Sequence, residues 1–320
     1  MATEFQIINK LRELFPKIGD DAVEFSVSNI PIVSTDSFVL GEHFGNYFTP
    51  YDMGYKSLAA SLSDIAACGG VPRYALISIG LEKGDIEFVG EFYRGVQTIA
   101  KDYKTEIIGG DTTKAGTPFI TVTVIGETTH FIGRKGAKLG DRICVTGTLG
   151  GSFAGLLALQ NGLKSHLTKR HLNPLPRIKE GVELALFATS MIDISDGLII
   201  DLSHILDESG VGAKIWRNRL PIDKETERLA SKFSSSPQEV LPQGFAPFPY
   251  GTGFAMNGGE DFELLCTIPQ KCIKEAKKRV AFTEIGEIIK IKNQKSKIKI
   301  IDEEGRGIPI KGFDHFSKKC

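Results

Sequence analysis

Acidic side chains recur in this chain at glycine-rich turns and at the ends of apolar runs. The six clusters are GDDAV at 19–23, STDS at 34–37, SLSDIAACGG at 61–70, IIGGDTT at 107–113, MIDISDGL at 191–198 and NGGEDFELL at 257–265. Most acidic residues lie on solvated surfaces, but Asp36, Asp111 and Asp193 follow runs that are typical of buried strands. Because α/β proteins place ligands at strand ends, we expect these carboxylates to surround a binding site.

So many carboxylates in one site would repel one another unless a cation lay between them. Hard oxygen ligands from several segments suit Mg²⁺, which usually keeps some of its waters and bridges phosphates. The sequence has no GxxxxGK[ST] motif and no GxGxxG loop before a VAIK-type lysine, so neither common kinase solution applies. The clusters therefore predict an enzyme that handles polyphosphate through several Mg²⁺ ions held by aspartates.

The composition sets limits on the class of protein. The chain has 320 residues, is 41% apolar and carries 39 basic and 39 acidic residues, which indicates two domains or one large one and gives no general attraction to nucleic acid or membranes. Its five cysteines form no CxxC pair, which argues against a thiol zinc or redox site and favours reduced thiols in the cytoplasm. No run of ~18 apolar residues is present, so we expect no membrane span.

The periodicity predicts an α/β first half followed by an α/β second half. In the first half we expect strands at 30–36, 74–81, 105–111 and 119–128 and helices at 50–68 and 86–103. In the second half we expect strands at 142–147, 190–194 and 262–268, helices at 153–161 and after Ser195 as N-cap, and a long loop at 231–253. The Lys-rich tract at 271–299 predicts a solvated helix and an exposed strand, with an anion-binding face as the alternative.

Two local patterns leave their function open. The helix at 50–68 begins with a capping box from Thr49 to Asp52, and Asp64 shares a polar stripe with Ser57 and Ser61, which is either a solvated face or part of a site. The GTLGGS turn at 147–152 either presents backbone N–H groups to an anion or is a simple turn from strand to helix.

The motifs in combination resemble the thiamine-monophosphate kinase family, within the aminoimidazole ribonucleotide synthetase superfamily. The resemblance runs from Gly19 to Phe316 and is carried, in family order, by GDDA, STD with EHF, SLSDIAA with GGVP, GGDTT, VTGTLGGSFAGL, IDISDGL, GGED and GFDHF. Ser61 departs from the family, in which Asn is common before the LSD triplet, and AACGG stands where AAMGA is commoner.

The resemblance implies a role for individual residues. The Mg²⁺ ligands, direct or through water, would be Asp21, Ser34, Thr35, Asp36, Asp64, Asp111, Asp193 and Asp196. The contacts to ATP would come from Tyr103, Gly110, Asp111, Arg134 and Ser195. The contacts to thiamine monophosphate would come from His43, Glu260 and Phe313.

The resemblance also implies the fold and the reaction. We expect a two-domain α/β (α+β) fold, with an ATP- and Mg²⁺-binding domain at 1–138 whose sheet forms a homodimer interface, and a C-terminal domain at 139–320 with a mixed sheet. A phosphomonoester acceptor has a second pKa of about 6, so it is already ionised and needs no general base. We therefore expect no catalytic base or covalent nucleophile, but direct in-line transfer of the γ-phosphoryl group of ATP.

Two other interpretations fit the sequence less well. Another ATP-using member of the superfamily would make selenophosphate or close an imidazole ring, but the first cysteine is Cys68 and the ring-closing GVGTK signature is absent. A non-enzymatic divalent-ion module would show regularly spaced DxDxDG loops, and the sequence has none.

Overall fold

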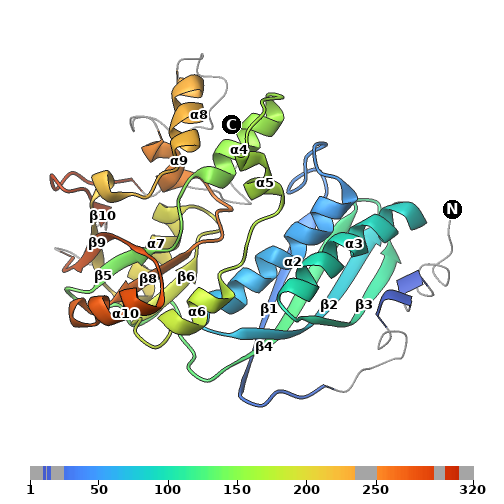
Figure 1. Cartoon of the computed structure of the whole chain (residues 1–320), viewed down its shortest axis with the longest axis horizontal. Helices are drawn as coiled ribbons and strands as arrows, with labels where there is room; N and C mark the ends of the chain where they lie inside the picture. The colour runs from blue at the N-terminus through green and yellow to red at the C-terminus, as the bar shows by residue number, and fades with distance from the viewer. Residues whose placement is uncertain (1–9, 12, 16–24, 235–250, 292–299, 310–320) are drawn as a thin grey trace. The chain divides into compact units, whose positions relative to one another are not determined.

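The computed structural model describes residues 10–11, 13–15, 25–234, 251–291 and 300–309. The chain divides into two compact units, one formed by 1–66 and 70–131, the other by 67–69 and 132–320 (Figure 1). Each unit has its own sheet, so the predicted α/β fold in two parts is confirmed. The domain boundary at 138/139, which rests on composition, stays a prediction.

The first unit is built on a four-stranded sheet in the order β1-β4-β2-β3. Its strands are β1 (Ile30–Val39), β2 (Val71–Leu81), β3 (Glu106–Lys114) and β4 (Phe119–Thr128). Helices α2 (Pro50–Ala67) and α3 (Ile86–Asp102) lie on one face of this sheet (Figure 1). The side chains of β1 alternate, so that Val33, Thr35 and Ser37 are exposed on the opposite face. The sheet therefore has one covered face and one face that no described element of its own unit covers.

The capping box predicted at the start of α2 is confirmed. Thr49 N–H donates to Asp52 Oδ2 at 3.2 Å, and Asp52 N–H donates to Thr49 Oγ1 at 3.2 Å. These reciprocal bonds satisfy two backbone donors that a helix start otherwise leaves free. They fix where α2 begins, and so which of its residues face β1.

Two glycines let α2 and α3 pack backbone against backbone. A Cβ on Gly54 would lie 2.0 Å from the carbonyl oxygen of Phe92, and a Cβ on Gly95 would lie 2.0 Å from that of Tyr51. No side chain fits at these distances, so the close helix pair depends on the two glycines.

We expect Gly54→Ala to lower the free energy of unfolding by about 1–3 kcal/mol, because the added methyl group forces the two helices apart. Gly90→Ala in α3 is the matched control, since a Cβ there meets nothing within 4 Å. That control should be neutral or stabilise by about 0.5–1 kcal/mol. Urea unfolding of both variants measures the difference, and equal stabilities would contradict the backbone contact.

The second unit is built on a six-stranded mixed sheet in the order β10-β7-β9-β5-β8-β6. Its strands are β5 (Arg142–Val145), β6 (Ser190–Asp193), β7 (Gly212–Ile215), β8 (Leu264–Ile268), β9 (Thr283–Ile289) and β10 (Ile300–Ile301). Among the described strands of this sheet, β10 and β7 pair in parallel and all other neighbours are antiparallel, so the predicted mixed C-terminal sheet is confirmed.

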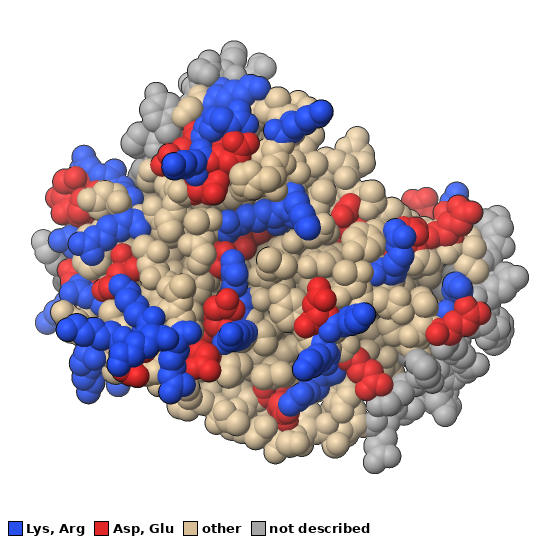
Figure 2. Space-filling view, viewed as in Figure 1, with Lys and Arg blue, Asp and Glu red and all other residues tan. Residues whose placement is uncertain are grey.

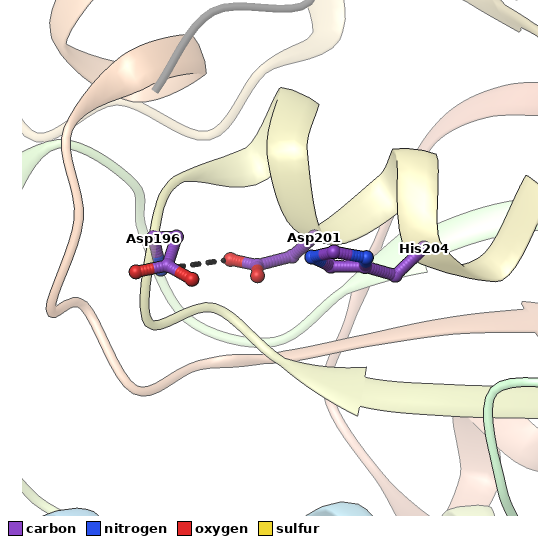
Figure 3. A group of neighbouring side chains, drawn as sticks. All are labelled: Asp196, Asp201 and His204. Carbon is purple, nitrogen blue, oxygen red and sulfur yellow. Dashed lines mark hydrogen bonds between the residues drawn. The ribbon is translucent and has the colours of Figure 1, made fainter. Parts of the chain in front are cut away.

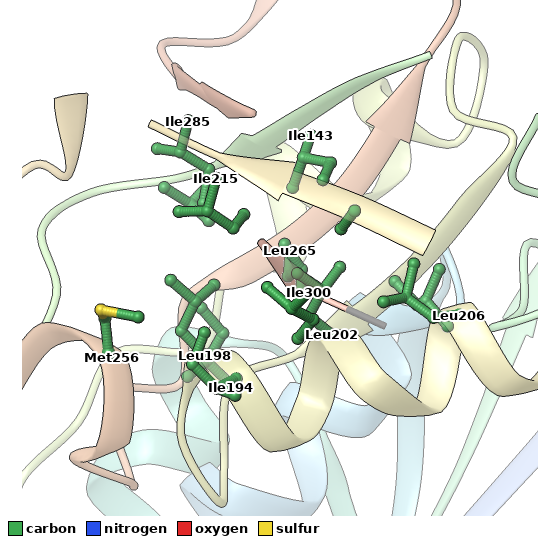
Figure 4. Packing of buried hydrophobic residues seen from close by; sticks show 14 of the residues in the cluster. Ile143, Ile194, Leu198, Leu202, Leu206, Ile215, Met256, Leu265, Ile285 and Ile300 are labelled. Carbon is green, nitrogen blue, oxygen red and sulfur yellow. The ribbon is translucent and has the colours of Figure 1, made fainter. Parts of the chain in front are cut away.

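The core of this unit lies between the sheet and α7 (Leu198–Ser209). Leu198, Leu202 and Leu206 of α7 pack under Ile143, Ile215 and Leu265 of the sheet, with Met256 of α9 (Thr252–Asn257) beside them (Figure 4). A second apolar cluster joins α4 (Gly151–Gln160), α5 (Leu167–Leu172), α8 (Lys224–Ser234) and α9. The remaining α-helices are α6 (Ile178–Leu184) and α10 (Ile273–Arg279), and two short 3-10 turns lie at Arg217–Arg219 and Gln270–Cys272.

Some predicted element boundaries in this half are wrong. The loop predicted at 231–253 is helical at both ends, because Phe233 of α8 and Phe254 of α9 bury themselves in the cluster with α4. Its central part, 235–250, lies outside the described residues. The strand predicted from Phe262 begins at Leu264, because Phe262 has a left-handed φ of 51° that no strand accommodates. Ser195 is not the N-cap of α7, which begins after Gly197.

In the Lys-rich tract, the exposed side of α10 is a solvated face of ion pairs, whereas Ile285 and Ile288 of β9 are buried in the core. The pairs are Lys277 with Glu284, Lys278 with Glu275 and Arg279 with Glu183. Figure 2 shows basic and acidic side chains interspersed over the face in view. These contacts favour the solvated reading over an anion-binding face. Within the described ranges, no helix has the length and apolar character needed to cross a membrane.

Candidate metal and phosphate site

Two predicted metal ligands of the first unit, Asp36 and Asp64, lie where β1 faces α2. Ser34 of β1 donates a hydrogen bond to Asp64 of α2, and Ser61 of α2 donates to Asp36 of β1 at 2.7 Å. Asp64 is therefore directed at the strand, which favours a site over a solvated face. Burial raises the pKa of Asp36, while the hydrogen bond from Ser61 acts in the opposite direction. Ser61, which departs from the family pattern, thus contacts a predicted metal ligand directly.

The other predicted ligands of the first unit lie apart from this group. The side chain of Thr35 is on the opposite face of β1, hydrogen-bonded to Thr123 at 3.0 Å. Asp111 is exposed on β3 and accepts a hydrogen bond from Thr112 N–H. The structure thus does not bring the side chains of Thr35 and Asp111 to Asp36.

The sheet register nevertheless aligns the two ends of the predicted site. Asp36 pairs with Val122, Val122 with Ile77, and Ile77 with Gly110, so that one row crosses all four strands. Three strand spacings separate Asp36 from Gly110 by about 14 Å, too far for a single ion. A Cβ on Gly110 would lie 1.9 Å from the carbonyl oxygen of Ile77, so only glycine fits there. The row therefore places Gly110 three strands away from Asp36.

His43 and Tyr103 are each held by backbone contacts. His43 follows β1, where its Nδ1 accepts a hydrogen bond from Val39 N–H at 3.0 Å and its ring packs edge-on against Phe38. Tyr103 ends α3 and donates its N–H to Ile99. Asp21 and Phe313, the remaining predicted ligand and acceptor contact, lie outside the described residues.

The acidic group of the second unit lies in the turn between β6 and α7. Asp193 ends β6 and is buried, and Asp196 is half-buried in the turn. Asp196, Asp201 and His204 each direct a ligand atom into one small region, with these atoms all within 4.8 Å of one another (Figure 3). Burial and the charge of Asp196 raise the pKa of Asp201 to about 7, against three backbone hydrogen bonds that lower it.

Arg134 lies close enough to this group to act on its charge. Burial lowers the pKa of His204, the charge of Arg134 lowers it further, and that of Asp196 raises it. The 134–137 segment is held against α7 by Ser209, whose Oγ accepts hydrogen bonds from Gly136 N–H and Ala137 N–H. Arg134 and Asp196 thus both act on the charge of His204, and the role of Arg134 in binding ATP stays a prediction.

Backbone hydrogen bonds join this turn to the GGED segment. Glu260 N–H donates to Ser195 at 2.8 Å, Phe262 N–H to Ile194 at 2.9 Å, and Ile194 N–H to Glu263 at 2.8 Å. A Cβ on Gly259 would lie 2.5 Å from the carbonyl oxygen of Ser195, so a glycine permits this approach. Glu260 itself has a φ of 61°, a strained conformation for a residue with a side chain. The predicted nucleotide contact Ser195 and the predicted acceptor contact Glu260 are therefore neighbours.

A buried network of ion pairs and hydrogen bonds holds Glu263, which closely follows the GGED segment. Glu263 accepts two hydrogen bonds from Arg177, at 2.6 and 2.7 Å, and one from Arg170 at 3.2 Å. Thr146 donates a fourth at 2.7 Å. The arginines have no local motif and were not predicted. The one available signal was an acidic residue inside the apolar run FELLCTI, because a buried charge needs a partner.

The GTLGGS turn binds an anion that belongs to the chain itself. Gly150 N–H and Ser152 N–H at the start of α4 donate to the two oxygens of Asp261, at 2.5 and 3.0 Å. Burial raises the pKa of Asp261 to about 6, while Arg170 and the two N–H groups act to lower it. An exogenous phosphate therefore has no access to these two donors in this structure.

Both acidic groups have the donors that a magnesium site needs. Each consists mainly of carboxylates and hydroxyls, which are the oxygen ligands that Mg²⁺ prefers. The burial that raises the pKa of Asp36 is the kind of environment in which a cation stabilises the carboxylate form. The groups therefore fit divalent cations that hold phosphates.

Comparisons with known proteins show which family this chain resembles in sequence. Residues 19–128 match the N-terminal domain of the AIR synthase related protein family, and residues 138–299 match its C-terminal domain. The chain is 38% identical to the thiamine-monophosphate kinase of Buchnera aphidicola (subsp. Acyrthosiphon pisum) over 98% of this chain and 99% of that one. It is 33% identical to the thiamine-monophosphate kinase of Aquifex aeolicus over 98% of each chain.

The fold is also similar to that of a solved protein with bound ligands. A structure described as "AaThiL complexed with AMPPCP and TMP" matches with a TM-score of 0.77 and 32% identity, covering 99% of both chains.

Proposed function

Since the chain belongs to the AIR synthase related family and, within it, to the thiamine-monophosphate kinases, we propose that it transfers the γ-phosphoryl group of ATP directly to thiamine monophosphate with the help of several Mg²⁺ ions. The products would be thiamine diphosphate and ADP. The single observation that supports this most is the joining of two turns, one with Asp193, Ser195 and Asp196, the other with Glu260. A candidate metal-binding turn is thereby held beside a candidate acceptor contact.

Mg²⁺ would be held in the first unit by Ser34, Asp36 and Asp64, and on β3, at the other edge of the sheet, by Asp111, the residue after Gly110. In the second unit it would be held by Asp193 and Asp196. When bound, the ions would neutralise the phosphate charges and stabilise the charge that develops on transfer. Thr35 would contribute through its backbone, because its side chain is directed to the other face. Asp21 stays in the proposal from the resemblance alone.

The chain's own residues would bind and orient the two substrates. Arg134 would contact the nucleotide phosphates, together with Gly110, Tyr103 and Ser195. Glu260 would face the cationic acceptor, with His43 and Phe313 as further contacts. The acceptor phosphate is already ionised near neutral pH, so the protein needs to align it rather than deprotonate it.

The first unit also supports a homodimer. Its open sheet face exposes Val33 by 68%, together with Thr35 and Ser37, and a second copy could cover these side chains. The free thiols of Cys144, Cys266 and Cys272 support a reducing compartment, the cytoplasm.

The direct test measures ADP release from the purified chain with Mg²⁺, ATP and thiamine monophosphate. We expect turnover with this acceptor and formation of thiamine diphosphate, detected by chromatography. Turnover with selenide or with an imidazole precursor, and none with thiamine monophosphate, would assign the chain to another branch of the superfamily.

Glu260→Gln should raise the KM for thiamine monophosphate about tenfold, since a hydrogen bond to a charged group is worth about 1.5–3 kcal/mol. The KM for ATP should change little. Glu183→Gln is the matched control, because its side chain is 33% exposed against 37% for Glu260, and it pairs with Arg279 on a solvated face. Steady-state kinetics with each substrate varied in turn measures the split, and equal increases in both KM values would remove Glu260 from the acceptor pocket.

A further inference from the structure

Asp201 has an unusual position at the start of α7. It is 1% exposed, although it carries a carboxylate. Its Oδ2 accepts hydrogen bonds from three consecutive backbone N–H groups, those of Ser195, Asp196 and Gly197, each at 3.1 Å. Figure 3 shows the bond from Asp196. Gly197, which precedes the helix, has no side chain that could cap it. The carboxylate of Asp201 therefore binds the N–H groups of the turn that precedes the helix, and not those of the helix's own first turn.

These bonds fix the backbone from which the candidate ligands extend. The N–H groups of the turn point inward to Asp201, so the directions in which the side chains of Ser195 and Asp196 leave the turn are set by that one carboxylate. The carbonyl of Ser195 accepts the N–H of Glu260 at 2.8 Å. Asp201 is thus bonded directly to the backbone of the candidate metal ligand Asp196, and through Ser195 it is linked to the candidate acceptor contact Glu260.

The carboxylate at position 201 is also repelled by a neighbouring carboxylate, which a neutral side chain in the same place would avoid. Asp201 and Asp196 bring two carboxylates into the same small region, together with His204. An asparagine could accept the same three hydrogen bonds without the repulsion between carboxylates. The negative charge at 201 therefore favours a bound cation in addition to the turn geometry.

We infer that Asp201 is a positioning residue of the phosphate site, which holds the 195–197 turn in its binding geometry and adds negative charge behind Asp196. The inference rests on the proposed function, since it assumes that Asp196 binds a cation that carries phosphate. Asp201 acts through the turn and needs no contact with either substrate.

The test compares Asp201→Asn and Asp201→Ala with the control Asp207→Asn, an exposed aspartate on the same helix. Calorimetry measures binding of AMPPCP in the presence of Mg²⁺, and hydrogen exchange follows the amides of 195–197 in the metal-free protein. We expect Asp201→Asn to fold and to weaken AMPPCP binding about tenfold, since residues that orient metal ligands are worth about 10–100-fold in affinity. Asp201→Ala should weaken binding more and speed exchange at the three amides, whereas Asp207→Asn should match the wild type in both measurements.

Two results would overturn the inference. One is faster amide exchange with unchanged AMPPCP affinity, which would mean that Asp201 stabilises the 195–197 turn but does not affect phosphate binding. The other is failure of both Asp201 variants to fold. A wild-type chain that binds AMPPCP with Mg²⁺ but does not phosphorylate thiamine monophosphate would contradict the proposed function only, because the binding test of Asp201 is independent of the acceptor.

Discussion

Asp36→Asn is expected to lower kcat/KM by about 10²–10³-fold while the fold survives, the size of effect seen when one electrostatic contact to a transition state is removed. Asn has almost the volume of Asp and keeps an oxygen that accepts the hydrogen bond from Ser61. What disappears is the negative charge beside Asp64, and with it a ligand for the cation that would bridge the phosphates. The loss should therefore appear in activity and in the Mg²⁺ concentration needed for half-maximal rate.

The control for this change is Ser37→Ala on the same strand. Ser37 lies on the exposed face of β1 and is hydrogen-bonded to Thr121, away from α2. We expect near wild-type kinetics for Ser37→Ala and a similar thermal midpoint for both variants. If Asp36→Asn kept full activity at a Mg²⁺ concentration that is limiting for the wild type, Asp36 would not be a metal ligand.

Glu263→Gln is expected to lower the free energy of unfolding by about 3 kcal/mol, because breaking a buried ion pair leaves an uncompensated charge. Glu263 is 1% exposed, and its carboxylate accepts from both Arg170 and Arg177. The amide of glutamine would turn an N–H₂ group toward one of these guanidinium groups, which also only donate. Urea or thermal unfolding measures the loss.

Glu287→Gln offers the matched comparison. Glu287 forms an ion pair with Arg142 at 2.8 Å, but its side chain is 33% exposed. Solvent screens such a pair, and we expect a loss below about 1 kcal/mol. Equal losses in the two variants would mean that Arg170 and Arg177 reach solvent once Glu263 is neutral, and that the network behind the GGED segment is weaker than its geometry indicates.

The local elements could be predicted because their signals lie close together in the sequence. Thr49, Pro50 and Asp52 mark the start of α2 within four residues, and the apolar run before Asp193 marks a strand that ends in an acidic turn. The strand predicted to end at Asp36 instead continues to Val39, because its last residues pair with β4. The residue types of the acidic clusters also predict Mg²⁺ and phosphate, because few other ligands suit so many carboxylates. The motif order then indicated the family.

The partners of these residues were decided only by the tertiary structure. Ser61 meets Asp36 across 25 positions, and Arg177 meets Glu263 across 86, so no local period could pair them. Ser195 was predicted as the N-cap of α7 from its residue type, but the helix begins after Gly197, and the N–H of Ser195 donates to Asp201 within the helix. Likewise, the GTLGGS turn can bind an anion, and folding fills it with Asp261. Sequence fixes which groups a segment offers, whereas packing decides which of them meet, because a buried donor or charge takes the partner that the fold brings within reach.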